Sequence, residues 1–170
     1  PPQLPARLAD GTVTFEHFTE QDCAELFVAL DDPRAWEHIP QAIPHDAAEL
    51  CDALTRKLAD GLRLTFIIRC AGRVAGMTSV LFDPADPGGC EVGGTQLGPA
   101  WWGTGVNTQC KRLLLGALFV RGAQWVQLRT DERNGRSAAA ISKLGARDLG
   151  THPDTRVRRD GTRRRSRIFR

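Results

Sequence analysis

The 170-residue sequence contains no tyrosine, a single methionine and no run of about 18 apolar residues. Without such a run, we expect no helix that crosses a membrane. The first ten residues also lack a basic segment followed by an apolar stretch, so no secretory signal peptide is expected. With no tyrosine, a phenol group cannot act as the proton donor of a reaction.

The sequence has five cysteines, an odd number, with no CxxC pair and no close Cys/His cluster. This pattern argues against a disulfide framework and against a zinc site, so we expect no metal. It favours a reducing cytoplasm and cysteines that pack as small apolar core residues. The residues concerned are Cys23, Cys51, Cys70, Cys90 and Cys110.

Composition fits one globular domain over residues 1–170, with 41% hydrophobic and 25% charged residues. The formal net charge of +3 excludes nothing, but its distribution is uneven. Between Arg156 and Arg170 there are eight arginines and one acid, Asp160. Such a run is typical of a solvated strand, and alternatively of a phosphate or nucleic-acid binding surface.

Apolar periodicity predicts the mixed order β-α-α-β-β-β-α-β-α-β-β. The predicted helices span residues 19–30, 47–60, 106–122 and 135–144. The predicted strands span 12–18, 64–70, 73–82, 90–97 and 125–130, followed by a hairpin with Asp160-Gly161 at its turn.

A glycine-rich turn, Trp102-Gly103-Thr104-Gly105, joins a predicted strand to a long predicted helix. Glycine lets the backbone approach a ligand closely, and a helix start adds unpaired N–H groups and partial positive charge. This arrangement predicts an anion cradle that suits a diphosphate. A Walker A loop is excluded because Gly105-Val106-Asn107 stands where Gly-Lys-Ser/Thr is required. A dinucleotide fingerprint is excluded because its third glycine is replaced by Thr108.

The same segment resembles the acetyl-CoA-binding motif of the GNAT superfamily, and in particular the RimJ/RimL-type N-acetyltransferases, which act on protein N-termini. One position departs from the superfamily pattern: Ala100 stands where Gln or Arg is usual. The resemblance covers nearly the whole chain, in the right order. Its residues are Glu91-Val92-Gly93, Leu97-Gly98-Pro99, Trp101 to Asn107, Gln127 to Asp131, Asn134, Arg136-Ser137, Lys143 to Ala146 and Arg158 to Thr162.

The resemblance implies a GNAT-like α/β domain with a mixed, mostly antiparallel central sheet flanked by helices. It implies direct transfer of an acetyl group from acetyl-CoA to a primary amine, with succinyl or another acyl group as an alternative. The candidate acceptors are a protein N-terminus, including that of a ribosomal protein, a peptide or a small amine. A cytoplasmic homodimer is also implied.

Direct transfer needs a neutral amine, stabilisation of the developing oxyanion, and a proton or dipole for the leaving thiolate. We expect Glu91 to act as the base; alternatively it pairs with an arginine of the basic tail. We expect Ser137 to act as the acid, since tyrosine is absent; alternatively Ser137 and Asn134 belong to a helix cap. The carbonyl oxygen is expected to meet backbone N–H groups near Leu97 and Gly98.

The acceptor is expected beside the loop from Trp36 to Asp46, where Trp36, His38 and Trp101 are candidate contacts. His38 or His45 is an alternative base. Two competing functions remain: a nucleic-acid- or ribosome-binding module that uses Arg156–Arg170, and a CoA-binding protein without catalysis. The residues expected to bind the cofactor are Leu97, Gly98, Trp102, Gly103, Gly105, Val106, Asn107, Thr108, Asn134, Ser137 and Lys143.

Overall fold

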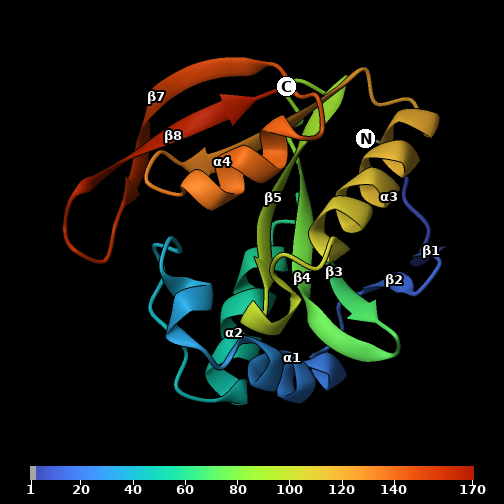
Figure 1. The fold of residues 1–170 in the computed structure, drawn as a ribbon, viewed down its shortest axis with the longest axis vertical. Coiled ribbons are helices and arrows are strands. Elements are labelled where there is room, and N and C mark those ends of the chain that lie inside the picture. The colour runs from blue at the N-terminus through green and yellow to red at the C-terminus, as the bar shows by residue number, and fades with distance from the viewer. Residues whose placement is uncertain (1–2) are drawn as a thin grey trace.

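A computed structural model describes residues 3–170, which form one eight-stranded sheet in the order β1-β2-β3-β4-β5-β6-β8-β7 (Figure 1). Neighbouring strands are antiparallel except for β5 and β6, which are parallel. The expected mixed, mostly antiparallel sheet is therefore confirmed. The strands are β1 (Arg7–Asp10), β2 (Val13–His17), β3 (Arg63–Cys70), β4 (Arg73–Phe82), β5 (Gly89–Leu97), β6 (Trp125–Asp131), β7 (Asp148–Val157) and β8 (Arg163–Phe169).

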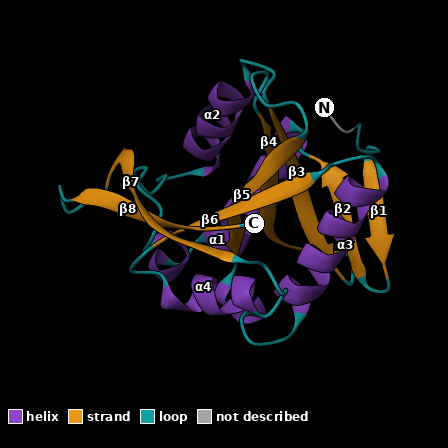
Figure 2. Ribbon diagram, turned by 90° about the horizontal axis from the view of Figure 1, so that it is seen from above, coloured by secondary structure: helices purple, strands orange, loops and turns teal. Residues whose placement is uncertain are grey.

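Four α-helices flank this sheet, and α3 and α4 cover one face while α2 covers the other (Figure 2). No helix within residues 3–170 is both long and apolar enough to span a bilayer. The helices are α1 (Cys23–Leu30), α2 (Ala47–Leu58), α3 (Val106–Val120) and α4 (Gly135–Ser142), with 3-10 turns at Glu20–Asp22, Pro33–Trp36 and Pro99–Trp101.

The predicted elements agree with these bounds to within a few residues, but one strand was missed. Strand β1 is short and mostly exposed, so it carries no apolar alternation that a sequence pattern could reveal. It forms because the chain turns at Gly11, whose φ is +56°, and pairs Leu8 with Phe15 across the turn.

Alternating side chains of the strands build two hydrophobic layers, one on each face of the sheet. In β3, Phe66 and Ile68 belong to the layer under α3, whereas Ile67 between them packs with the residues of α1 and α2. All three side chains are fully buried. The period-two alternation of a strand thus fixes which face each helix covers.

The cysteine prediction is wrong for two residues and confirmed for three. Cys23 of α1 and Cys51 of α2, which are 28 residues apart in sequence, form a disulfide that joins the two helices. The pair was missed because helix packing, not sequence spacing, brings the two positions together. Cys70, Cys90 and Cys110 are free and buried, as expected for small core residues.

The sheet divides where its two halves meet. Strands β5 and β6 pair only from Gly89 with Trp125 to Val92 with Leu128, after which β6 continues beside β8. On the other side of β5, the register with β4 shifts between Met77 and Ser79, which places a β-bulge at Gly94-Thr95 of β5. Strands β5 and β6 therefore separate beyond Val92.

Candidate active site

A cavity of about 620 Å³ lies at this separation and is lined from both faces of the sheet. We call its two parts the glycine end and the arginine end. The glycine end comprises Gly103, Gly105, Asn107, Thr108, Asn134, Ser137 and Lys143; the arginine end comprises His38, Lys57, Arg63, Glu91, Arg129, Arg156 and Arg164.

The glycine end is built mainly from backbone. Gly103 and Gly105 have φ values of +73° and +88°, and a Cβ at either position would meet no atom within 4 Å. Gly105 is the N-cap of α3 and has no side chain to cap the helix. Val106 N donates to Thr104 Oγ1 at 3.4 Å, while the next N–H groups, those of Asn107 and Thr108, have no capping side chain within the described residues. The Oδ1 atom of Asn107 is buried and accepts no hydrogen bond within residues 3–170, so it could accept one from a ligand. The open N–H groups of the turn and the helix dipole suit an anionic ligand such as a diphosphate.

Trp102 forms a wall of this end through contacts on several sides. Its Nε1 donates to the carbonyl oxygen of Leu97 at 2.9 Å. The guanidinium carbon of Arg136 lies 3.5 Å from a Trp102 ring centroid, and that of Arg34 lies at 5.8 Å. The tryptophan therefore links the end of β5 to the start of α4 and fixes the glycine turn between them.

Asn134 caps helix α4, which agrees with the predicted alternative that Asn134 and Ser137 belong to a helix cap. Its Oδ1 accepts from the backbone N–H of Ser137 at 3.0 Å, and both residues line the cavity. No protein hydrogen bond of the Ser137 hydroxyl is found within residues 3–170, so this group is available to a ligand. Lys143, at the other end of α4, also lines the cavity.

Two predicted site residues have structural roles outside the cavity. The N–H of Gly98 donates to Ala75 O at 2.9 Å, and a Cβ on Gly98 would lie 2.3 Å from Ala29 O. Gly98 is thus needed for close packing, and its N–H cannot receive an oxyanion. Trp36 is 6% exposed and donates through Nε1 to Leu30 O at 2.8 Å, which makes it a core residue beside α1.

Four further predicted residues divide in the same way. Val106, the first residue of α3, is buried in the core, and His45 is exposed just before α2, so neither lines the cavity. His38 and Trp101 do line it, as expected of acceptor-side residues. His38 Nε2 lies 3.8 Å from Glu37. Of the two candidate histidine bases, only His38 is positioned to reach a ligand.

Glu91 points into the arginine end and pairs with an arginine, although not one from the basic tail. Its Oε2 lies 3.1 Å from Nη2 of Arg129 and accepts from Nε2 of Gln127, also at 3.1 Å. Both partners come from β6, since Glu91 lies directly opposite Gln127 in the parallel pair. Within the described residues, Glu91 Oε1 receives no protein hydrogen bond and remains open to a ligand or water.

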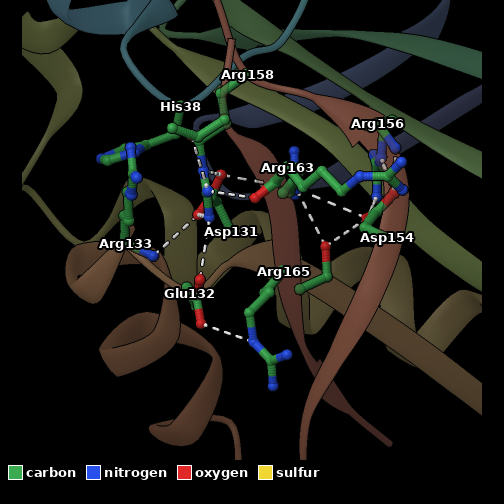
Figure 3. A network of polar contacts seen from close by, with 12 residues as sticks. His38, Asp131, Glu132, Arg133, Asp154, Arg156, Arg158, Arg163 and Arg165 are labelled. Atoms are coloured by element: carbon green, nitrogen blue, oxygen red, sulfur yellow. Dashed lines mark hydrogen bonds and ion pairs between the residues drawn. The ribbon is translucent and has the colours of Figure 1, made fainter. Parts of the chain in front are cut away.

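Behind Glu91, two buried aspartates organise the arginines of the C-terminal hairpin (Figure 3). Asp131 accepts two hydrogen bonds from Arg158, both at 2.9 Å. Asp154 accepts from Nη2 of Arg156 at 2.5 Å, and its pKa lies well below the usual range because that hydrogen bond outweighs the effect of burial. Arg164 lies between them, 3.8 Å from Asp131 and 3.7 Å from Asp154.

This network changes the interpretation of the arginine-rich tail. Most of its arginines already have acidic partners, which include Asp131, Asp154, Glu132 and Asp148. Arg159 donates instead to the backbone oxygen of Trp36 at 2.8 Å. Two arginines of the run, Arg156 and Arg164, line the cavity. Because most of the run is ion-paired, it is not a free cationic surface, which weighs against nucleic-acid binding.

Lys111 is a buried cation that lies between the two ends. Its Nζ donates to Thr95 Oγ1 at 2.5 Å and to Thr78 Oγ1 at 3.4 Å, and no carboxylate pairs with it in the part of the chain described. Burial lowers the pKa of Lys111 from 10.5 to about 8. The hydroxyls belong to β4 and β5, so the ammonium lies under the bulge of β5.

Sequence reasoning missed most of the cations of the cavity. The only local signal is strand alternation, which places Arg63 of β3 in one row with Leu81 and Glu91. The partners on β6, β7 and β8 come from distant sequence and have no motif. The missed residues are Lys57, Arg63, Lys111, Arg129, Arg156 and Arg164.

A split mixed sheet with a glycine turn at a helix start defines an acyltransferase-like α/β protein, and sequence comparison agrees. A model of the acetyltransferase (GNAT) domain matches residues 12–147. This chain therefore belongs to the GNAT acetyltransferase family. No curated protein matches the sequence.

Solved structures of acetyltransferases share the fold. A probable GNAT-family acetyltransferase from Chromobacterium violaceum has a TM-score of 0.90 at 22% identity, over 99% of this chain and 87% of its own. An acetyltransferase from Salmonella typhimurium that modifies the N-terminal serine of ribosomal protein L7/L12 has a TM-score of 0.79 at 16% identity, over 94% of both chains. The microcin C7 self-immunity acetyltransferase MccE, in complex with acetyl-CoA and AMP, has a TM-score of 0.79 at 15% identity, over 94% of this chain and 92% of its own.

Proposed function

We propose that this chain is an N-acetyltransferase that moves an acetyl group directly from acetyl-CoA to a primary amine. The observation that carries the proposal is one continuous cavity, which joins the open N-terminus of α3 to the carboxylate of Glu91. The donor and the acceptor can thus meet at the separation of β5 and β6. A solved neighbour that holds acetyl-CoA supports this donor.

The glycine end would hold the donor. The diphosphate suits the open N–H groups beside Gly103 and Gly105, with Asn107 and Thr108 in the first turn of α3. Lys143 adds positive charge at the same end. Because backbone groups supply most of this cradle, the departure at Ala100 removes a side-chain contact and leaves the cradle intact.

Proton transfer would use one group on each side of the thioester. Glu91 Oε1 accepts a proton from the acceptor ammonium, directly or through water, and frees the nitrogen lone pair. The nitrogen then attacks the carbonyl carbon, and the carbon–sulfur bond breaks. The Ser137 hydroxyl, which has no protein partner within residues 3–170, can donate a proton to the departing thiolate. It recovers a proton from the nitrogen, which loses its second proton as the amide forms, and Glu91 releases its own proton to solvent.

Several finer features belong to the same proposal. Residues 1–170 are proposed as a single domain, of which 1–2 lie outside the described residues. A cytoplasmic homodimer is proposed on the resemblance to RimJ/RimL-type enzymes. A ribosomal protein N-terminus is one candidate acceptor, in view of the Salmonella neighbour, although its identity of 16% supports the fold alone.

The proposal is tested by titrating acetyl-CoA and by measuring release of free CoA with a panel of amines and peptides. We expect saturable binding and amine-dependent thiol release. Glu91→Gln should lower kcat about 100-fold with acetyl-CoA affinity unchanged, whereas Glu37→Gln at an exposed position should have no effect. Binding without release on any acceptor would support the non-catalytic alternative. Absence of acetyl-CoA binding would contradict the proposal that the glycine end holds the donor.

A further inference from the structure

The arginine end carries more positive charge than its own acids balance. Five cationic side chains line it, whereas two carboxylates, Glu91 and Asp131, face the same cavity. Asp154 lies behind the wall and is already shared between Arg156 and Arg164. The five cations are Lys57, Arg63, Arg129, Arg156 and Arg164.

Two of these cations form no ion pair in the part of the chain that the structure describes. Lys57, in the last turn of α2, and Arg63, at the start of β3, form no ion pair within residues 3–170. Burial lowers the pKa of both side chains, and the charge of Arg63 lowers the pKa of Lys57 further. For Arg63, the charges of Glu91 and Asp60 oppose the effect of burial, and the charge of Arg156 adds to it. Keeping unpaired charges partly out of water costs free energy, which an anionic ligand would recover.

The position of Arg63 links this surplus to the reaction site. Its backbone is in register with Leu81, which is in register with Glu91. Its Nη1 lies 3.3 Å from the point that a Cβ on Gly94 would occupy, so the guanidinium extends over the bulge of β5. An anion bound to Arg63 would lie beside the separation of β5 and β6, so that a single small molecule could contact both Arg63 and Glu91.

A further unpaired donor belongs to the same region. The Nε of Arg129 is buried and has no hydrogen-bond partner within residues 3–170, although its Nη2 contacts Glu91. The surrounding positive charge also disfavours an ammonium and favours the neutral amine that can attack a thioester. A polycationic acceptor would be repelled from this end, whereas an amine with its own negative charge would be attracted.

We propose that the acceptor is a small primary amine that carries a carboxylate or phosphate close to its nitrogen, and that Lys57 and Arg63 bind this anionic group. The inference rests on the proposed acetyl transfer and specifies its substrate class. The anion docks on the two unpaired cations, while the amine is directed toward Glu91 and the thioester.

The test compares matched acceptors with the wild-type enzyme. Free α-amino acids are compared with their primary amides, and O-phosphoethanolamine with ethanolamine, so the two pairs separate carboxylate from phosphate. We expect kcat/KM to be about tenfold or more higher for the anionic member of at least one pair. Equal or better rates with the neutral members of both pairs would overturn the inference while leaving acetyl transfer intact. No transfer to any amine would remove the proposed function and the inference together.

Variants locate the effect. Lys57→Met and Arg63→Met should each raise KM for the anionic acceptor about tenfold, with KM for acetyl-CoA and the rate with neutral amines unchanged. Arg56→Met, at the exposed neighbour of Lys57 on α2, is the matched control and should change nothing. Equal losses with anionic and neutral acceptors would contradict the assignment. If Arg63→Met does not fold, the wild-type comparison decides alone.

Discussion

The two ends of the cavity are built from different materials. The glycine end presents backbone N–H groups at a helix start, with few charged side chains. The arginine end presents charged side chains from six strands and helices, held in place by buried aspartates. A backbone cradle recognises any ligand with a diphosphate, whereas a side-chain cluster can change its ligand by a few substitutions. Donor recognition and acceptor recognition are thus separate problems in this fold.

Removing a buried aspartate should damage the arginine end most. Asp154→Asn leaves Arg156 without its carboxylate partner and leaves Arg164 with Asp131 alone. We expect the free energy of unfolding to fall by about 3–5 kcal/mol, measured by urea denaturation. Asp148→Asn, which breaks the exposed pair with Arg167, should cost less than about 1 kcal/mol. Equal effects of the two variants would mean that burial of the network contributes nothing.

Opening the disulfide should loosen the same side of the molecule. The Cys23–Cys51 bond joins α1 and α2, which pack against the sheet on the face of Arg63. Cys51→Ala should lower the free energy of unfolding by about 3 kcal/mol, since a loop of this length gains much freedom in the unfolded chain. In reductant, the free energy of unfolding of the wild type should fall to that of the variant, whereas that of the variant should not change. Acetyl-CoA affinity should stay within about twofold in both.

A substitution at the helix start should affect the glycine end alone. Gly105→Val places a β-branched residue at a φ of +88° and fills the open space before α3. We expect the Kd for acetyl-CoA to rise about 100-fold, as measured by calorimetry. Gly122→Val is the matched control, because Gly122 ends the same helix at a φ of +92° with equally open surroundings. It should show a similar loss of stability and unchanged affinity.

Lys111 gives the smallest predicted effect and a pH signature. Because its folded pKa is lowered to about 8, the folded protein binds fewer protons than the unfolded chain between about pH 8 and 10.5. Wild-type stability should therefore rise with pH across that window. Lys111→Met should be about 2 kcal/mol more stable than wild type near pH 7, and the difference should shrink toward pH 10. A constant difference would show that burial of the charge is not its cause.

The same contrast explains what the sequence could predict. The glycine turn, its strand and its helix are contiguous, so local rules grouped Gly103, Gly105, Asn107 and Thr108 as one candidate segment, and all four line the cavity. Glu91 became a candidate because it lies on the strand that leads into the turn, and it lines the same cavity. The partner of Glu91, Arg129, lies on a parallel strand reached only through α3, and no local pattern encodes that register.

Two wrong predictions at the site have equally physical reasons. Gly98 was expected to offer its N–H to a ligand, but antiparallel pairing directs that group to Ala75. Trp36 was expected beside the acceptor, but the 3-10 turn before the loop directs its indole inward to Leu30. Sequence identifies the segment that forms a wall; packing decides which side chains of that segment face the ligand.

The short pairing of β5 with β6 has a consequence for how ligand binding affects the stability of the sheet. Beyond Val92, the edge of β5 that faces β6 loses its partner strand while the sheet continues on both sides. Buried backbone groups without partners are a defect in a sheet. An extended molecule bound in this interval would pair with that edge of β5 and connect the two halves of the sheet. Ligand binding would then stabilise the fold as well as fill the site.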